Sequence, residues 1–194
     1  RSLGGAGLVV MGVGFGAQSL GKGFCAGVVL LIENQIRVGD VVEIAGLAGV
    51  VEEISLRRVR LRGYDGNVHH ISNGLITTVT NLSTDFAYAV VDVGVGYKEN
   101  IDEVFSVMTE TAKAMREDGA FAAKLQGDLE IAGVDQWADS AIVIRARIKT
   151  NALEQWGVRR EYLKRLKAAF DARGISIPFP HRTLIVENAE PLKP

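Results

Sequence analysis

A long uncharged stretch opens the chain and constrains its fold more than any other feature. No charged side chain occurs from Ser2 to Gly21. About twenty residues in an α-helix rise roughly 30 Å, which is the thickness of the hydrocarbon core of a bilayer. The stretch therefore predicts a transmembrane helix, which we place at residues 1–33.

Small residues recur along this stretch in two rows. One row contains Gly7, Gly14 and Gly21, seven residues apart with Ala17 between them, and the other contains Gly5, Gly12, Gly16, Ser19 and Gly23. In water each glycine weakens a helix by up to about 1 kcal/mol relative to alanine. In lipid, small residues let helix backbones approach closely. Two such rows predict a neighbour on each side, as in a ring of identical helices.

Larger apolar residues lie between the two rows. Leu8, Met11 and Phe15 share one face of the helix because they are three and four residues apart. In a ring of helices this face would line the centre. Glycines flank a charge at Lys22, so we predict a kink near Ser19–Gly23 and a second, amphipathic segment after it.

The arginines that follow this stretch and the first residue of the chain each lead to an expectation about the whole protein. Five arginines follow the uncharged stretch, at Arg37, Arg57, Arg58, Arg60 and Arg62. By the positive-inside tendency, residues after about 33 are expected on the cytoplasmic side. The chain begins with Arg1 rather than methionine, so we expect it to be part of a longer protein. A single cysteine, Cys25, excludes an internal disulfide framework.

Two other interpretations of the uncharged stretch remain. A buried helix of a soluble protein could be equally apolar, although core helices rarely need so many glycines. The residues Gly12-Val-Gly-Phe-Gly-Ala17 also fit the pattern of a dinucleotide-binding turn, with Glu33 about twenty residues on, at the end of Val28–Ile32. No further strand–helix units follow in the manner of a parallel sheet, so the motif alone carries this alternative.

Short strands with turn signals fill residues 34–83. The predicted strands are Val41–Ile44, Val50–Ile54, Leu56–Leu61 and Val68–Ile71, with turns at Asp65-Gly66 and Ser72-Asn-Gly74. About five short strands in fifty residues predict a small, Sm-like β-barrel. His69 and His70 are adjacent in a strand and point to opposite faces, so they are not expected to chelate a metal together.

From residue 84 onward the sequence shows the order strand, helix, strand, strand, helix, strand, of which the last strand follows a domain assigned to residues 84–180. The predicted elements are Phe86–Val95, a helix capped by Asn100 and running to Arg116, Leu129–Ala132, Ala141–Ile148, a helix from Leu153 to Gly174 with Trp156, Leu163, Leu166 and Phe170 on its apolar stripe, and Arg182–Val186. This order predicts a ferredoxin-like α+β domain, followed by a C-terminal strand and tail at residues 181–194. The predicted fold class is thus a membrane α-helix joined to α+β domains.

Motifs for catalysis are missing from the sequence. It contains no Ser/His/Asp or Cys/His constellation, no CxxC pair, no HExxH and no phosphate-binding loop. We therefore expect no enzymatic activity, no cofactor and no metal. The arginines between Arg57 and Arg62 leave a further alternative, a soluble oligomeric β-barrel scaffold or an RNA-binding module.

Several ordered motifs resemble one known family. They are Gly14-Phe-Gly-Ala-Gln18, Gly27, Glu33-Asn-Gln-Ile-Arg-Val-Gly-Asp40, Gly46-Leu-Ala-Gly-Val-Val-Glu-Glu-Ile54, Asp65-Gly66, Ser72-Asn-Gly74 and Gly174-Ile-Ser-Ile-Pro-Phe-Pro180. Together they resemble the small-conductance mechanosensitive channel (MscS) family over essentially the whole chain. The resemblance implies a homoheptamer in a bacterial inner membrane, in which seven kinked helices line a pore that membrane tension opens. Its implied partners are lipid and the released ions and small osmolytes, with no nucleic acid.

The resemblance also implies roles for individual residues. The two apolar constriction rings of the family match Met11 and Phe15, and its helix-packing small residues match Gly12, Gly14 and Gly16. Ser19 stands where familiar members have the kink glycine, so we expect bending at Gly21 or Gly23 instead. The family's first two membrane helices, which sense lipid tension, are not in this sequence.

Overall fold

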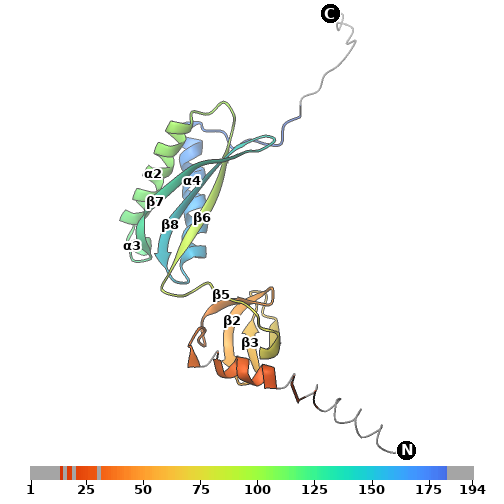
Figure 1. Cartoon of the computed structure of the whole chain (residues 1–194). Coiled ribbons are helices and arrows are strands. Elements are labelled where there is room, and N and C mark those ends of the chain that lie inside the picture. The colour runs from red at the N-terminus through yellow and green to blue at the C-terminus, as the bar shows by residue number, and fades with distance from the viewer. Residues whose placement is uncertain (1–13, 15–16, 19–20, 30–31, 183–194) are drawn as a thin grey trace, which may run out of the picture. The chain divides into compact units, whose positions relative to one another are not determined.

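The structure, a computed structural model, describes residue 14 and residues 17–18, 21–29 and 32–182. The chain separates into two compact units, Arg1–Ala87 and Tyr88–Pro194. Figure 1 shows a small β-sheet unit and a larger unit of helices on a sheet, each of which is described by itself.

The first unit is an antiparallel sheet of five short strands. They are β1 (Val41–Ile44), β2 (Leu47–Ile54), β3 (Arg58–Arg62), β4 (Val68–Ser72) and β5 (Val79–Asn81), in the order β4-β3-β2-β1-β5. Alternate residues of the strands point inward and form a core of Ile36, Val42, Ile44, Val51, Val59, Leu61 and Ile71. The four strands expected from sequence are present with slightly different ends, whereas the three-residue strand β5 was not predicted by range.

An irregularity in β2 explains its two adjacent glutamates. Val51 pairs with Leu61 but Glu53 pairs with Arg60, so Glu52 is the extra residue of a β-bulge. In a regular strand neighbouring side chains point to opposite faces. The bulge instead lets both carboxylates reach Arg60, at 3.0 Å from Glu52 and 3.4 Å from Glu53.

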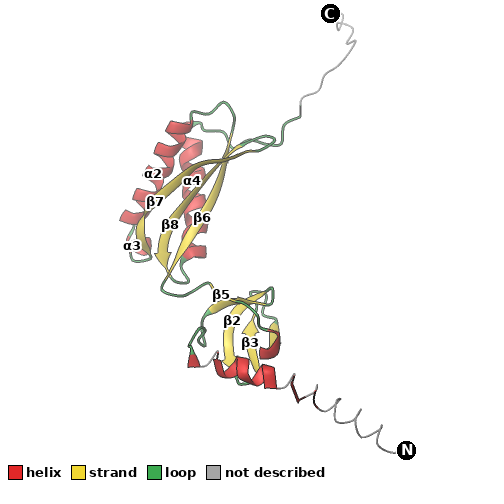
Figure 2. Ribbon diagram, in the orientation of Figure 1, coloured by secondary structure: helices red, strands yellow, loops and turns green. Residues whose placement is uncertain are grey.

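The described part of the N-terminal helix lies against this sheet. Residues 21–29 are helical and cross the lower end of the strands in Figure 2. The helix ends at a left-handed residue, Asn34, with φ of 53°. Val28, Val29 and Ile32 are helical. These three residues therefore do not form the strand over Val28–Ile32 that a dinucleotide-binding fold would need.

The second unit packs two helices on one face of a sheet. Its elements are β6 (Phe86–Val95), α2 (Ile101–Glu117), α3 (Gly119–Ala122), β7 (Leu125–Trp137), β8 (Ile142–Asn151) and α4 (Gln155–Arg173), and the strand order is β6-β8-β7. Asn100 caps α2 by accepting hydrogen bonds from the amides of Asp102 and Glu103, as its sequence predicts. Gly174, with φ of 69°, ends α4.

The apolar face of α4 differs in one respect from the expected stripe. Leu166 and Phe170 are buried in the core, but Trp156 is 38% exposed. Tyr162 takes the central place instead, because its ring is buried and its hydroxyl donates to the carbonyl of Met108 on α2 at 3.1 Å. Burial raises the pKa of this phenol, so it stays a neutral donor.

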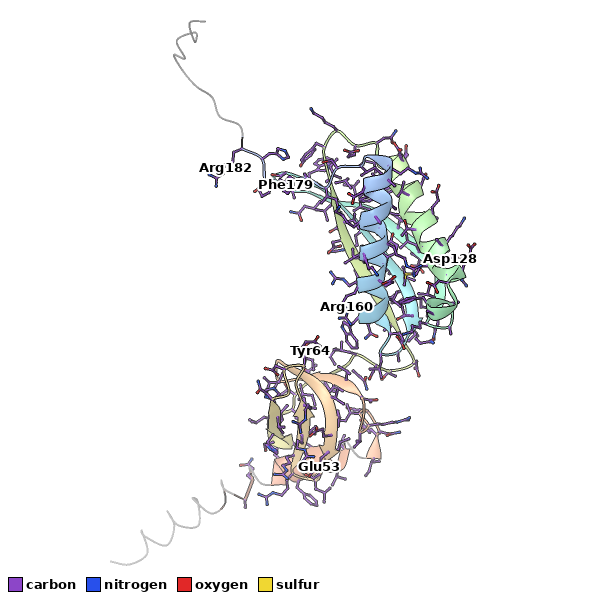
Figure 3. The ribbon with its side chains drawn as sticks, turned by 180° about the vertical axis from the view of Figure 1, so that it is seen from behind. Glu53, Tyr64, Asp128, Arg160, Phe179 and Arg182 are labelled. Carbon is purple, nitrogen blue, oxygen red and sulfur yellow. The ribbon has the colours of Figure 1, made fainter. Side chains whose placement is uncertain are left out.

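The chain after α4 is extended. The amide of Gly96 donates to the carbonyl of Ser176 at 3.1 Å, and the amide of Ser176 donates to Glu99 at 3.1 Å. Phe179 is 82% exposed and projects from this segment in Figure 3. The predicted final strand, Arg182–Val186, lies outside the described residues except for Arg182, so it stays a prediction.

Candidate functional site: the junction of the helix with the β-sheet

Most residues of the predicted pore lie outside the described part of the chain. These are Met11 and Phe15, predicted to constrict the pore, Gly7, Gly12 and Gly16, predicted to pack helices, and Ser19, predicted at the kink. Among the described residues, no helix is long and apolar enough to cross a membrane. The roles of these six residues therefore stay predictions.

Three described residues from one of the two predicted rows of small residues are exposed. Gly14, Ala17 and Gly21 are helical and exposed. A methyl group added to Gly14 or Gly21 would meet no atom within 4 Å in this chain. This helix face is thus unoccupied by the chain's own described residues.

Two glycines further along the helix touch the β-sheet unit. Gly23 faces the backbone of Gly74, where an added Cβ would lie 3.4 Å from the amide nitrogen. Gly27, one turn later, is buried, and a Cβ there would lie 2.1 Å from the carbonyl oxygen of Leu56. Since real Cβ contacts are not that short, the helix can approach this turn only because residue 27 has no side chain.

Asn73 fixes the turn that the helix contacts. It is fully buried, its amide donates to the carbonyl of Arg57 at 3.0 Å, and its Nδ2 donates to the carbonyl of Ser55 at 2.8 Å. Both acceptors belong to the turn between β2 and β3. The side chain therefore keeps this turn in place under the helix, and the added Cβ at Gly27 would meet its Nδ2 at 2.4 Å.

Local hydrogen bonds fix the chain between the helix and β1. The amide of Glu33 donates to Val29 at 2.9 Å in the last helical turn, and the Nε of Arg37 donates to the side chain of Asn34 at 3.2 Å. The amide of Arg37 donates to the carboxylate of Asp40 at 3.0 Å. These bonds make the exit a defined turn, which carries the chain directly into β1.

The exposed face of β3 is charged but locally paired. Arg62 donates two hydrogen bonds to Glu52, one of them at 3.2 Å, and Arg58 lies 3.6 Å from Glu53. The hydrogen bond from Arg62 holds the pKa of Glu52 below its usual range. Two glutamates thus offset three of the four arginines between Arg57 and Arg62 on which the nucleic-acid alternative depends.

The described ranges hold no cluster of His, Cys, Asp or Glu that could bind a metal ion. His70 is exposed on β4 opposite Arg60, and neighbouring His69 is half-buried. Cys25 is exposed and unpaired on the helix.

Sequence reasoning missed the roles of Gly27 and Asn73. Both residues occur in the motifs quoted above, Gly27 at the end of an apolar run and Asn73 within a predicted turn. Neither signal indicates which distant backbone each of them approaches, because that depends on how the helix packs against the β2–β3 turn. The structure supplies this contact.

Comparison with known proteins identifies the two units. Residues 19–84 match the family model of the mechanosensitive ion channel β-domain, and residues 89–177 match that of the C-terminal domain of the mechanosensitive ion channel MscS. The small-conductance mechanosensitive channel of Caldanaerobacter subterraneus subsp. tengcongensis is 36% identical over 187 residues, which cover 94% of this chain and 64% of that protein. The moderate conductance mechanosensitive channel YbiO of Escherichia coli is 30% identical over 99% of this chain and 26% of its own length. The chain thus spans less than two thirds of these curated relatives.

Solved structures agree with this family. The crystal structure of Helicobacter pylori MscS in its closed state superimposes with a TM-score of 0.79 at 25% identity, covering 95% of this chain and 72% of that one. Arabidopsis thaliana MSL1, at 14% identity and a TM-score of 0.65, shares the fold. Two consecutive family models, sequence similarity over nearly the whole of this chain and a shared fold lead to one conclusion: the chain belongs to the MscS family of mechanosensitive ion channels.

Proposed function

We propose that this chain is the pore helix and cytoplasmic part of a tension-gated ion channel in a bacterial inner membrane, assembled as a homoheptamer. The match of two consecutive family models across residues 19–177 carries this proposal. The relatives from Caldanaerobacter and Escherichia coli are both mechanosensitive channels. Membrane lipid, permeating ions and small osmolytes are its proposed partners, and residues after about 33 are proposed to be cytoplasmic.

The proposed gate is apolar. Rings of Met11 and Phe15 from identical helices would form a narrow neck that excludes water and blocks ions without a plug. Tension favours the state that occupies more membrane area, so tilting the helices widens the neck. The small residues Gly7, Gly12, Gly14, Gly16, Ala17 and Gly21 would let neighbouring helices slide past one another without side-chain collisions.

Features of the described helix support this proposal. Gly14 and Gly21 leave open space within the chain, as residues reserved for another helix would. Beyond them, Gly23 and Gly27 hold the helix close to the β-sheet unit. A pore helix that is attached to a cytoplasmic domain needs open space for neighbouring helices at one end and close contact with the domain at the other end.

Patch recording of the full-length protein in liposomes tests the proposal. We expect stepwise currents that appear only under suction, and we expect Phe15→Ser to lower the opening tension by hydrating the neck. Phe24→Ser is the matched control, since Phe24 is helical and half exposed but lies beyond the predicted neck. Well-inserted protein without tension-dependent current would refute the proposed function, and equal thresholds for the two variants would exclude Phe15 from the gate.

A further inference from the structure

The side chain of Asn81, at the end of β5, lies where three segments of the first unit meet. Its Nδ2 donates to the carboxylate of Asp40 at 2.8 Å and to the carbonyl of Gln35 at 3.3 Å. Its Oδ1 accepts from the amide of Ser83 at 3.0 Å and from the Ser83 hydroxyl at 3.1 Å. Both donors and both lone pairs of the carboxamide are therefore in use.

The bonded groups belong to functionally different parts of the chain. Gln35 follows the helix directly, Asp40 precedes β1, and Ser83 lies on the segment that leaves β5 toward the second unit. Further bonds close the network: the amide of Val41 donates to the Ser83 hydroxyl at 3.0 Å, and the amide of Leu82 donates to the carbonyl of Val41 at 2.8 Å. The Asn81 side chain thus connects the segment that enters the β-sheet unit after the helix to the segment that leaves it after β5.

We propose that Asn81 is a positioning residue that couples the end of the pore helix to the chain leaving the β-sheet unit. The β1–β5 ladder already pairs Val42 with Asn81. That ladder stops short of the turn after the helix, and the Asn81 side chain is what extends the connection back to Gln35. Without it, residues 35–40 would still be attached to β2, through the bond from the amide of Gly39 to Val51, and to the core, through buried Ile36, but Gln35 and Asp40 would have no side-chain bond to β5. With it, such a displacement reaches strand β5 and the segment beyond.

The chemistry of the network explains why an amide is needed. Aspartate at position 81 could still accept from Ser83 but would have no proton to donate, and its charge would face that of Asp40. Exchanging the two groups, with Asn81→Asp and Asp40→Asn together, restores one donor and one acceptor between the positions. Asn67 offers a matched control, because its Nδ2 also bonds an aspartate, Asp65, but within a single turn.

Amide hydrogen exchange on the full-length protein tests the coupling without relying on channel activity. We expect Asn81→Asp to speed exchange at the amides of Arg37 and Val41 by about tenfold or more, since the segment that carries them loses its bonds to residue 81, whereas the amide of Ser83 keeps its acceptor. The double variant should recover part of this protection. Exchange at Leu61 and Ile71 in the core should stay unchanged. Unaltered exchange at the network amides, or equal acceleration throughout the sheet, would overturn the coupling.

The consequence for gating rests on the proposed function and is measured separately. We expect Asn81→Asp to lower the midpoint tension of the full-length channel, because the helix end is then released from the sheet, and Asn67→Asp to leave it unchanged. Ile71→Val, a core change that weakens the sheet without touching the network, should also leave it unchanged. If exchange accelerates while the midpoint stays constant, Asn81 has no role in positioning the gate. If the wild type carries no current, the proposed function fails while the exchange result still decides the coupling.

Discussion

Adding one methyl group at Gly27 should weaken the first unit markedly. The Cβ of alanine would lie 2.1 Å from the carbonyl oxygen of Leu56 and 2.4 Å from Nδ2 of Asn73, so the helix or the turn must move by about 1 Å. Movement of the turn breaks the buried bond from Asn73 to Ser55, at a cost of about 1–3 kcal/mol, and the overpacking adds about 1–3 kcal/mol. The higher helix propensity of alanine recovers up to about 1 kcal/mol of this free energy. The net loss in the free energy of unfolding is about 1–5 kcal/mol, with about 3 kcal/mol at the middle of this range.

Thermal unfolding of the detergent-solubilised protein measures this loss. For a chain of this size, a loss of about 3 kcal/mol lowers Tm by about 6–12 °C. Gly23→Ala is the matched control on the same side of the helix, since its Cβ would lie 3.4 Å from Gly74, within ordinary contact range. We expect it to stay within about 1 kcal/mol of the wild type. A Gly27→Ala protein as stable as Gly23→Ala would refute the contact and the reasoning built on it.

Three further predictions concern the second unit. Asn100→Ala should cost about 1 kcal/mol in chemical denaturation because two amides of α2 lose their acceptor, and Asn100→Ser should recover most of it. Tyr162→Phe should cost about 1 kcal/mol by removing the bond to Met108, and an unchanged denaturation midpoint would contradict that bond's contribution. A hydrogen bond from Arg145 holds the pKa of Asp92 below its usual value of about 3.9, so the pair stabilises the fold above that pH and its contribution is lost as the pH falls through the lowered pKa. The Tm difference between wild type and Asp92→Asn should therefore be constant from about pH 5 to 7 and shrink below about pH 4, whereas a constant difference down to pH 2 would exclude this linkage.

Local signals in the sequence predict much of the second unit. Asn100 and Gly174 are recognisable as caps without tertiary information, because each acts on its own helix end. Spacing predicts the buried positions Leu166 and Phe170 correctly. Trp156 is wrong because the buried face of α4 begins with Gln155 and continues through Val158 and Tyr162, so Trp156 lies beside this face rather than on it.

The junction residues are harder to predict because their partners are distant in the chain. Asn81 bonds Gln35 across 46 positions and Asp40 across 41, and Asn73 bonds Ser55 across 18. A sequence pattern indicates that asparagine favours turns, but it does not indicate which backbone carbonyl the amide reaches. Similarly, the adjacent glutamates of β2 act together only because a bulge brings them to one face.

The two attachments of the helix together restrict how it can move. Gly27 holds the last turns of the helix against the β2–β3 turn, and the Asn81 network holds the chain just beyond the helix end. A rod held at two points cannot change its tilt relative to the sheet unless one attachment breaks. Residues 23–29 are therefore expected to move with the β-sheet unit as one body. Any bend that accompanies the proposed opening of the pore is then expected before Gly23, and Gly21, which has free space around it, is the described residue best suited to it.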